Sequence, residues 1–170
     1  MDADSDDGDA TASAFKTLRT ERTDAVARVI LDRPAELNTI TPALLEEFAS
    51  AIDTLEADND VRCLLLSGAG DRAFSAGAEL TALADDEMTT TDGVELARAG
   101  QQTFDRLDAC DTPVVAAVDG VCLGGGMELA AAADLRVATA GSTFGQPEHS
   151  LGLLPGWGGT QRLPNLIGES

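Results

Sequence analysis

The sequence predicts an α/β protein. Three apolar runs rich in β-branched residues, 25–32, 61–66 and 114–118, have the length and bounding turn residues of buried strands. Between them, apolar residues recur at the three- and four-residue spacing of amphipathic helices. This alternation of strand and helix favours α/β layering with right-handed crossover connections, and periodicity alone allows a doubly wound sheet.

The first half of the chain begins with two expected strands, 15–19 and 25–32, joined by a turn over residues 21–24. Thr41 and Pro42 then predict a helix start, with Thr as the N-cap and Pro at the first helical position. The buried stripe of this helix is expected to hold five apolar residues: Leu44, Leu45, Phe48, Ile52 and Leu55. After the strand at 61–66, residues 67–70 predict a turn, and FSAGAEL predicts a small-residue loop that enters a helix.

In the second half, the polar residues 89–92 predict a mobile connection, followed by a helix that ends near Asp108. The strand at 114–118 leads through Asp119-Gly120 to three glycines and the Ala-rich run 127–133, which has high helix propensity. Short strands are expected at 135–138 and 142–144. The segment 156–166 predicts a Gly-rich turn and the start of a helix.

Composition limits the functions that are open to the chain. Its 170 residues carry 30 acidic and 11 basic side chains, a formal net charge of −19, and Lys16 is the single lysine. This balance argues against nucleic acid and anionic membranes as partners, because both bind basic surfaces. It favours a solvated acidic surface that works in high salt, where screening relieves the self-repulsion, and an ordinary acidic surface is the alternative.

Other sequence features predict one cytoplasmic domain. No apolar run reaches membrane-spanning length, and the N-terminus lacks a signal-peptide pattern. Residues 1–12 are expected to be a disordered acidic tail and 13–170 a single core domain. Cys63, Cys110 and Cys122 lie in or beside apolar segments, which favours buried free thiols over a disulfide or a metal site.

The stretch from Pro113 to Pro155 carries the strongest functional signal. Glycines 124–126 precede a helix, where ligands can approach the backbone closely and free N–H groups favour negative charge. Two carboxylates, Glu128 and Glu148, lie within this otherwise apolar stretch. Taken alone, the two carboxylates have two interpretations of equal weight. Either Glu128 is a first-turn residue favoured by the helix dipole and Glu148 is a surface loop residue, or the two form a pair of acid/base groups.

Four blocks in this order make the chain resemble the crotonase superfamily, the enoyl-CoA hydratase/isomerase family. They are RPAELNTI (33–40), FSAGAEL (74–80), GVCLGGGMELA (120–130) and FGQPEHSLGLLPGWGGTQRLP (144–164). The resemblance covers most of the chain from Arg33 onward. It implies a superhelix of repeated ββα units, a fold that the sequence does not reveal through any strong internal repeat.

The resemblance also implies how the site works. The two backbone donors of an oxyanion hole map onto Ala76 and Gly125. Glu128 is expected to hold and activate a water, and Glu148 to protonate the α-carbon of an enoyl thioester. The residues expected to bind acyl-CoA are Ala35 and Leu37 at the nucleotide end, Ala76, Gly77, Ala78 and Glu79 along the pantetheine, and also Gly124, Gly125 and Trp157, the last as a packing or pocket-wall residue.

By the same resemblance, CoA is part of the substrate and no separate cofactor is expected. His149 is the single histidine, too few for a metal cluster, and a nucleophilic triad has no signature here. Relatives continue into a C-terminal helical region that covers the acyl-CoA site and builds a homotrimer or a dimer of trimers. The chain ends after Gly168, so a truncated form is expected.

Three functions remain open. The first is an enoyl-CoA hydratase, and the second an enoyl-CoA isomerase or another crotonase-type enzyme, because relatives share the scaffold and differ in acid/base groups. The third is a shortened, non-catalytic protein that binds acyl-CoA or a partner subunit. A dinucleotide oxidoreductase is disfavoured, because LGGGM lacks the G-x-G-x-x-G spacing.

Overall fold

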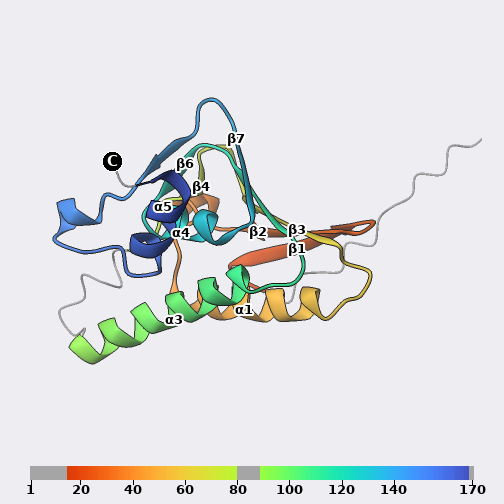
Figure 1. The fold of residues 1–170 in the computed structure, drawn as a ribbon, viewed down its shortest axis with the longest axis horizontal. Helices are drawn as coiled ribbons and strands as arrows, with labels where there is room; N and C mark the ends of the chain where they lie inside the picture. Colours follow the sequence, from red (N-terminus) through yellow and green to blue (C-terminus); the bar gives the residue numbers. More distant parts are fainter. Residues whose placement is uncertain (1–14, 80–88, 169–170) are drawn as a thin grey trace, which may run out of the picture.

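A five-stranded sheet forms one wall of the molecule (Figure 1). The computed structural model describes residues 15–79 and 89–168. Strands β1 (Leu18–Thr23) and β2 (Val26–Leu31) form an antiparallel hairpin, and β3 (Cys63–Gly68), β5 (Val114–Val118) and β7 (Leu135–Ala138) continue it in parallel. The order β1-β2-β3-β5-β7 leaves β7 at an edge.

A second sheet has the order β4-β6-β8, formed by the parallel strands Ala73–Ser75, Val121–Leu123 and Thr143–Gly145. The chain places one strand in each sheet in turn, β3 then β4, β5 then β6, β7 then β8. A helix follows each of these strand pairs: α3 (Thr90–Asp108) comes after β4, α4 (Gly125–Ala132) after β6, and α5 (Gly159–Ile167) after β8. This is the expected superhelix of ββα units, not a doubly wound sheet.

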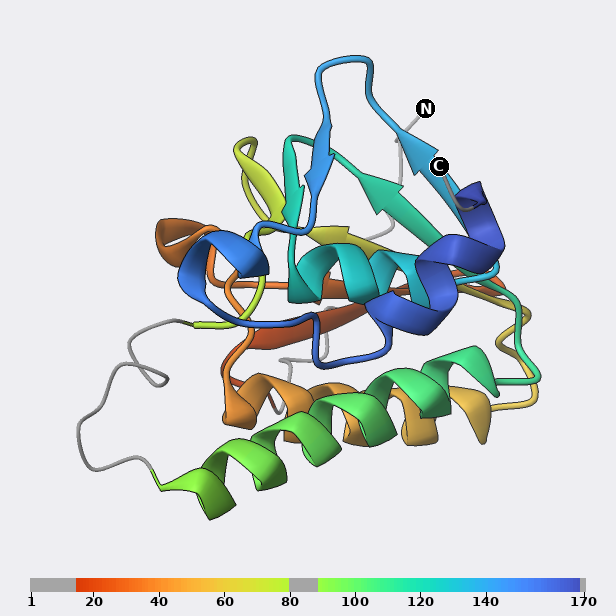
Figure 2. The ribbon, with the colours of Figure 1, turned by 60° about the vertical axis from the view of Figure 1, so that its left-hand side comes forward.

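Helices α1 (Pro42–Glu56) and α3 lie side by side on one side of the sheets (Figure 2). The predicted start of α1 is confirmed, since the Oγ1 of Thr41 accepts a hydrogen bond from the N–H of Leu44 at 3.1 Å and Pro42 follows. Its predicted stripe is also buried, except that Leu55 is only partly covered at the rim of the core. Burial of this stripe against the sheet stabilises the layer, since each large apolar side chain contributes about 1.5–3 kcal/mol.

Several predicted boundaries were wrong. Strand β1 extends to Thr23, through residues expected to form a turn, because its polar side chains face solvent and Glu21 pairs with Arg28 across the hairpin at 3.0 Å. Ser67 and Gly68 belong to β3, where they pair with the end of β2. Thr89 opens α3 through a capping box with Asp92, so this segment is an ordered helix start and not a mobile connection.

Strand β6 was missed, and two other predictions cannot be compared with the structure. Val121–Leu123 is too short and too close to the glycines to give a strand pattern, but it completes the second sheet between β4 and β8. The acidic tail at 1–12 and the helix expected after FSAGAEL lie outside the described residues.

The three cysteines differ in burial. Cys122 is buried, Cys63 and Cys110 are partly buried, and all three are free thiols. Burial raises the pKa of Cys122 to about 12, which keeps this thiol protonated and unreactive. None of the described helices combines the length and the apolar character needed to cross a membrane.

Asn38 anchors the loop that follows β2 and was not identified from the sequence. Its side chain is completely buried, and its Nδ2 donates to the carbonyls of Ala69 (3.0 Å) and Ala73 (2.8 Å) while its Oδ1 accepts from the N–H of Arg33 (3.0 Å). Its own carbonyl accepts from the hydroxyl of Ser75 at 2.8 Å. Asn38 thus fixes strand β4, from which the candidate site begins.

We expect Asn38→Ala to lower the free energy of unfolding by at least about 2 kcal/mol, because it removes three hydrogen bonds to backbone groups, two of them buried. Urea unfolding measures this loss. Asn165→Ala, which removes a single exposed hydrogen bond, is the control and should change stability by less than about 0.5 kcal/mol. A loss for Asn38→Ala as small as that of the control would contradict the assigned role.

Candidate active site

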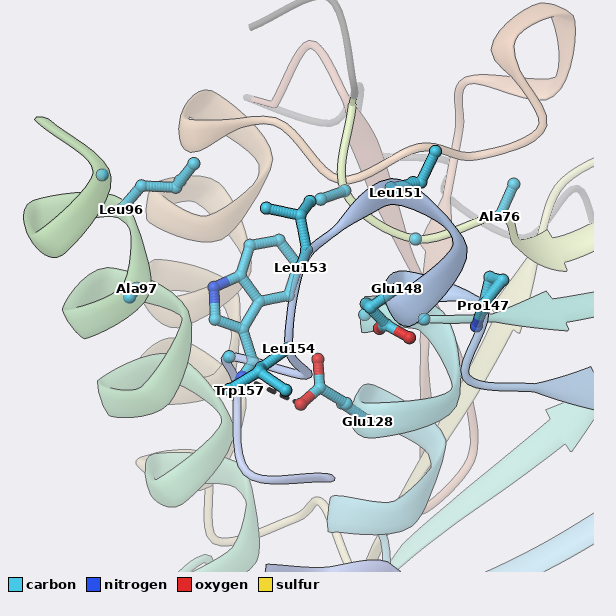
Figure 3. A pocket seen from close by; sticks show the side chains of 16 residues that line it. Ala76, Leu96, Ala97, Glu128, Pro147, Glu148, Leu151, Leu153, Leu154 and Trp157 are labelled. Atoms are coloured by element: carbon cyan, nitrogen blue, oxygen red, sulfur yellow. Dashed lines mark hydrogen bonds between the residues drawn. The ribbon is translucent and has the colours of Figure 1, made fainter. Parts of the chain in front are cut away.

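A pocket of about 230 Å³ lies where the start of α4 meets the loop after β4, helix α3 and the segment 147–157 (Figure 3). It brings together the four groups that the sequence analysis placed in one site: Ala76, Gly125, Glu128 and Glu148. These residues come from different turns of the superhelix, so the fold itself assembles the site. Of the other expected substrate-binding residues, Gly77, Ala78, Gly124 and Trp157 also line the pocket.

Glycines allow the loop after β4 to touch the start of α4. Gly77 has a φ of 95°, and a Cβ there would lie 2.8 Å from the carbonyl oxygen of Leu123 and 3.1 Å from the nitrogen of Gly125. A Cβ on Gly125 would collide with the indole of Trp157 at 2.3 Å. Both positions therefore require glycine, which brings two stretches of backbone N–H groups to one side of the pocket.

The structure corrects one of the two oxyanion donors. The N–H of Ala76 donates to the carbonyl of Leu37 at 2.9 Å, so it is not available to a ligand. Ala78 lies opposite Ile40, and this pairing uses the carbonyl of Gly77 (2.8 Å) and the N–H of Glu79 (3.0 Å). The N–H of Ala78 has no acceptor among the described residues, and its nitrogen lies 3.5 Å from where a Cβ on Gly125 would be.

Gly125 is the first residue of α4, and its N–H likewise has no acceptor within the described part of the chain. Unpaired N–H groups at a helix start attract negative charge. The free N–H groups of Ala78 and Gly125 are therefore suited to stabilise a carbonyl oxygen that gains negative charge.

Glu128 is buried in the first turn of α4, with 2% of its surface exposed. Its Oε1 accepts hydrogen bonds from the N–H groups of Trp157 and Gly159, both at 2.8 Å. Burial raises the pKa of Glu128, and the negative charge of Glu148 adds to this, whereas the two N–H groups and Arg162 oppose it. A buried carboxylate with a raised pKa is a stronger base than a solvated one.

This shift predicts a pH dependence of stability. Because the folded-state pKa of Glu128 lies above its ordinary value of 4.5, its contribution to stability is fully present below pH 4.5 and is lost as the pH rises through the folded-state pKa. We therefore expect the Glu128→Gln variant to gain stability relative to the wild type as the pH rises through this window. Urea unfolding across the window measures the difference, and a constant difference would contradict it.

Glu148 begins the short 3-10 helix η2 (Glu148–Leu151) and is half-buried. Its carboxylate points toward that of Glu128 across the pocket (Figure 3). With its amide nitrogen turned toward the carboxylate, Gln146 donates to both oxygens of Glu148, at 2.7 and 2.9 Å. This contact orients Glu148, and sequence reasoning gave no signal for it.

Three expected CoA-binding residues lie outside this pocket. Ala35 belongs to the 3-10 helix η1 (Pro34–Glu36), and Leu37 follows it with a φ of 54°. Glu79 forms an ion pair with Arg33 at 3.3 Å. The guanidinium of Arg33 also donates to Thr39, so both side chains are engaged within the protein.

His149 is exposed and does not line the pocket, as expected for a neighbouring polar residue. The Nε2 of its ring lies 3.4 Å from the hydroxyl of Ser150. Within 15–79 and 89–168, no group of three or more His, Cys, Asp or Glu side chains is arranged to hold a metal ion.

Comparison with known proteins agrees with this geometry. The sequence profile of the enoyl-CoA hydratase/isomerase family matches residues 21–170. The chain is 42% identical over 148 residues to a short-chain-enoyl-CoA hydratase of Clostridium acetobutylicum, covering 87% of this chain and 56% of that protein. It is 37% identical over 155 residues to a crotonyl-CoA hydratase of Syntrophomonas wolfei, covering 91% of this chain and 59% of that protein.

Solved structures give the same result. An enoyl-CoA hydratase from Bacillus anthracis superposes with a TM-score of 0.87 at 35% identity, covering 91% of this chain and 60% of that one. The chain thus spans somewhat more than half the length of these relatives. The matched profile, the sequence identity to these relatives and the ββα superhelix lead to one conclusion: the chain belongs to the enoyl-CoA hydratase/isomerase family.

Proposed function

We propose that the protein is an enoyl-CoA hydratase, which adds water across the double bond of a 2-trans-enoyl-CoA thioester. The observation that supports this most strongly is the pocket in which two free backbone N–H groups, of Ala78 and Gly125, share one space with the carboxylates of Glu128 and Glu148. The names of the relatives in Clostridium and Syntrophomonas are consistent with this activity.

In the proposed reaction, the thioester oxygen accepts hydrogen bonds from Ala78 and Gly125, which stabilises the negative charge that forms as the β-carbon is attacked. Glu128 orients the attacking water and receives its proton, which its raised pKa favours. Glu148 delivers a proton to the α-carbon. One water is added, and transfer of a proton between the facing carboxylates restores the starting state.

Hydration of crotonyl-CoA, followed as the loss of enoyl absorbance, tests this proposal, and we expect 3-hydroxybutyryl-CoA as the product. If a 3-enoyl-CoA is converted to its 2-enoyl isomer and crotonyl-CoA is not hydrated, the protein is an isomerase. If butyryl-CoA binds in calorimetry but neither reaction occurs, the protein is a non-catalytic acyl-CoA-binding protein.

We propose that CoA enters only as part of the substrate, without a further cofactor.

We also propose that the protein forms a homotrimer or a dimer of trimers. Leu135 and Val137, on edge strand β7, are 63% and 64% exposed, and an apolar edge of this kind is typical of an interface. Light scattering with and without butyryl-CoA tests the assembly, and a monomer under both conditions would contradict it.

We further propose that the protein works in the cytoplasm at high salt. Its net charge of −19 makes self-repulsion large in dilute buffer, and molar salt screens it. We expect the melting temperature to rise between dilute buffer and molar potassium chloride. Equal melting temperatures in the two buffers would argue for an ordinary acidic surface.

A further inference from the structure

The pocket has two chemically different sides. The carboxylates of Glu128 and Glu148 lie on one side, in the pocket that Ala78 and Gly125 also line. The other side is apolar and is formed by Leu96 and Ala97 of α3, Leu153 and Leu154, and the indole of Trp157 (Figure 3). An acyl chain whose thioester lies at the N–H groups extends toward this apolar side, because burial there removes its methylene groups from water.

The indole of Trp157 fills the space between α3 and α4. It is only 5% exposed, and its ring meets that of Phe104 edge-on, with centroids 5.6 Å apart. A Cβ on Gly100 of α3 would lie 2.3 Å from the indole, and so would a Cβ on Gly125 of α4. The ring is therefore held between two glycines, where it has no room to move aside.

The backbone of Trp157 is fixed as firmly as its ring. Its N–H donates to the Oε1 of Glu128 at 2.8 Å, and its carbonyl accepts from the guanidinium of Arg162 at 3.2 Å. Arg162 in turn pairs with Asp105 of α3 at 2.6 Å. An acyl chain could displace the indole only by moving this backbone, which would also disturb the hydrogen bonds of Glu128. The indole therefore stays in place when a longer substrate enters.

We infer that Trp157 sets the acyl-chain length that the pocket accepts and restricts the protein to short-chain acyl-CoA thioesters. The effect on turnover rests on the proposed hydratase function, but the effect on binding does not. Trp157 acts here through its side chain, whereas its contact with Glu128 is made by the backbone. Substitutions of the indole can therefore change length selection while the N–H that holds Glu128 is kept.

The test compares crotonyl-CoA with 2-octenoyl-CoA for hydration, and butyryl-CoA with octanoyl-CoA for binding by calorimetry. In Trp157→Ala, we expect the ratio of kcat/KM for the eight-carbon over the four-carbon substrate to rise at least about 10-fold, since one methylene in an apolar pocket already changes kcat/KM by about 10- to 200-fold. The corresponding ratio of binding constants should shift in the same direction. Trp157→Leu provides a milder variant if the alanine variant does not fold.

Two further variants make the result specific. Phe48→Leu removes volume from the α1 core, away from this pocket, and should leave the chain-length ratio within about 2-fold of the wild type. Gly100→Leu combined with Trp157→Ala refills the vacated space from α3 and should return the ratio toward the wild-type value.

Unchanged ratios for both substrate pairs in folded Trp157 variants would overturn the inference, and so would a wild type that binds octanoyl-CoA as tightly as butyryl-CoA. If no variant hydrates either enoyl-CoA but the binding ratio shifts as expected, the hydratase function fails and the assignment of Trp157 stands. If crotonyl-CoA is hydrated but the kinetic and binding ratios of the Trp157 variants are unchanged, the hydratase function stands and the assignment of Trp157 fails.

Discussion

Replacing Glu148 by glutamine is expected to lower the rate of crotonyl-CoA hydration by at least about 10²-fold, because the amide cannot deliver a proton to the α-carbon. Glutamine has nearly the same shape and can still contact Gln146, so binding of butyryl-CoA should be retained. Glu128→Gln is expected to cause a loss of similar size, because it keeps an oxygen for the N–H groups of Trp157 and Gly159 but loses the base. Steady-state kinetics of crotonyl-CoA hydration measures both losses.

His149→Ala is the matched control for Glu148→Gln. His149 is the next residue in the chain, is exposed and does not line the pocket, so its replacement should leave the rate within about 2-fold of the wild type. Hydration by Glu148→Gln at the wild-type rate would remove Glu148 from the proposed reaction.

Replacing Ala78 by proline is expected to lower kcat by about 10²–10³-fold, the cost of losing one oxyanion donor. Proline has no N–H, and the N–H of Ala78 is not used in the pairing with Ile40, which depends on Gly77 and Glu79. The loop should therefore keep its position while the site loses one donor. Kinetics with crotonyl-CoA measures the loss, and calorimetry with butyryl-CoA shows whether the pocket is still formed.

Ala78→Gly keeps the N–H and is expected to lose far less activity than Ala78→Pro. If the proline variant binds butyryl-CoA and hydrates crotonyl-CoA at the same rate as the glycine variant, the N–H of Ala78 is not the donor. Ala76 cannot take this role while its own N–H is bonded to Leu37.

Local patterns in the sequence were sufficient to predict most of the helices and strands, whereas the superhelix followed only from the family resemblance. Thr41 and Pro42 mark the start of α1, and the apolar run at 114–118 marks β5, because these signals depend on neighbouring residues alone. Strand β6 has three residues and leads directly into glycines, so only its pairing with β4 and β8 defines it. Likewise, β1 was placed too early because its solvent-facing polar residues resemble a turn.

The sequence motifs were sufficient to predict the two glutamates of the candidate site, but not the contacts that join distant segments around them. Glu128 and Glu148 were assigned from their blocks, and the structure places both in one pocket. Which N–H of the loop after β4 is free depends on the pairing of Ala78 with Ile40, two residues far apart in the chain. The hydrogen bonds of Asn38, and the clamp on Glu128 by the N–H groups of Trp157 and Gly159, also join distant segments.

A crystal structure of the protein with bound butyryl-CoA tests the central claim most directly. We expect the thioester oxygen to accept hydrogen bonds from the N–H groups of both Ala78 and Gly125, at about 2.7–3.1 Å, with the carboxylates of Glu128 and Glu148 facing the α- and β-carbons. A thioester bound away from these two N–H groups, or with either carboxylate out of reach of those carbons, would contradict the proposed reaction.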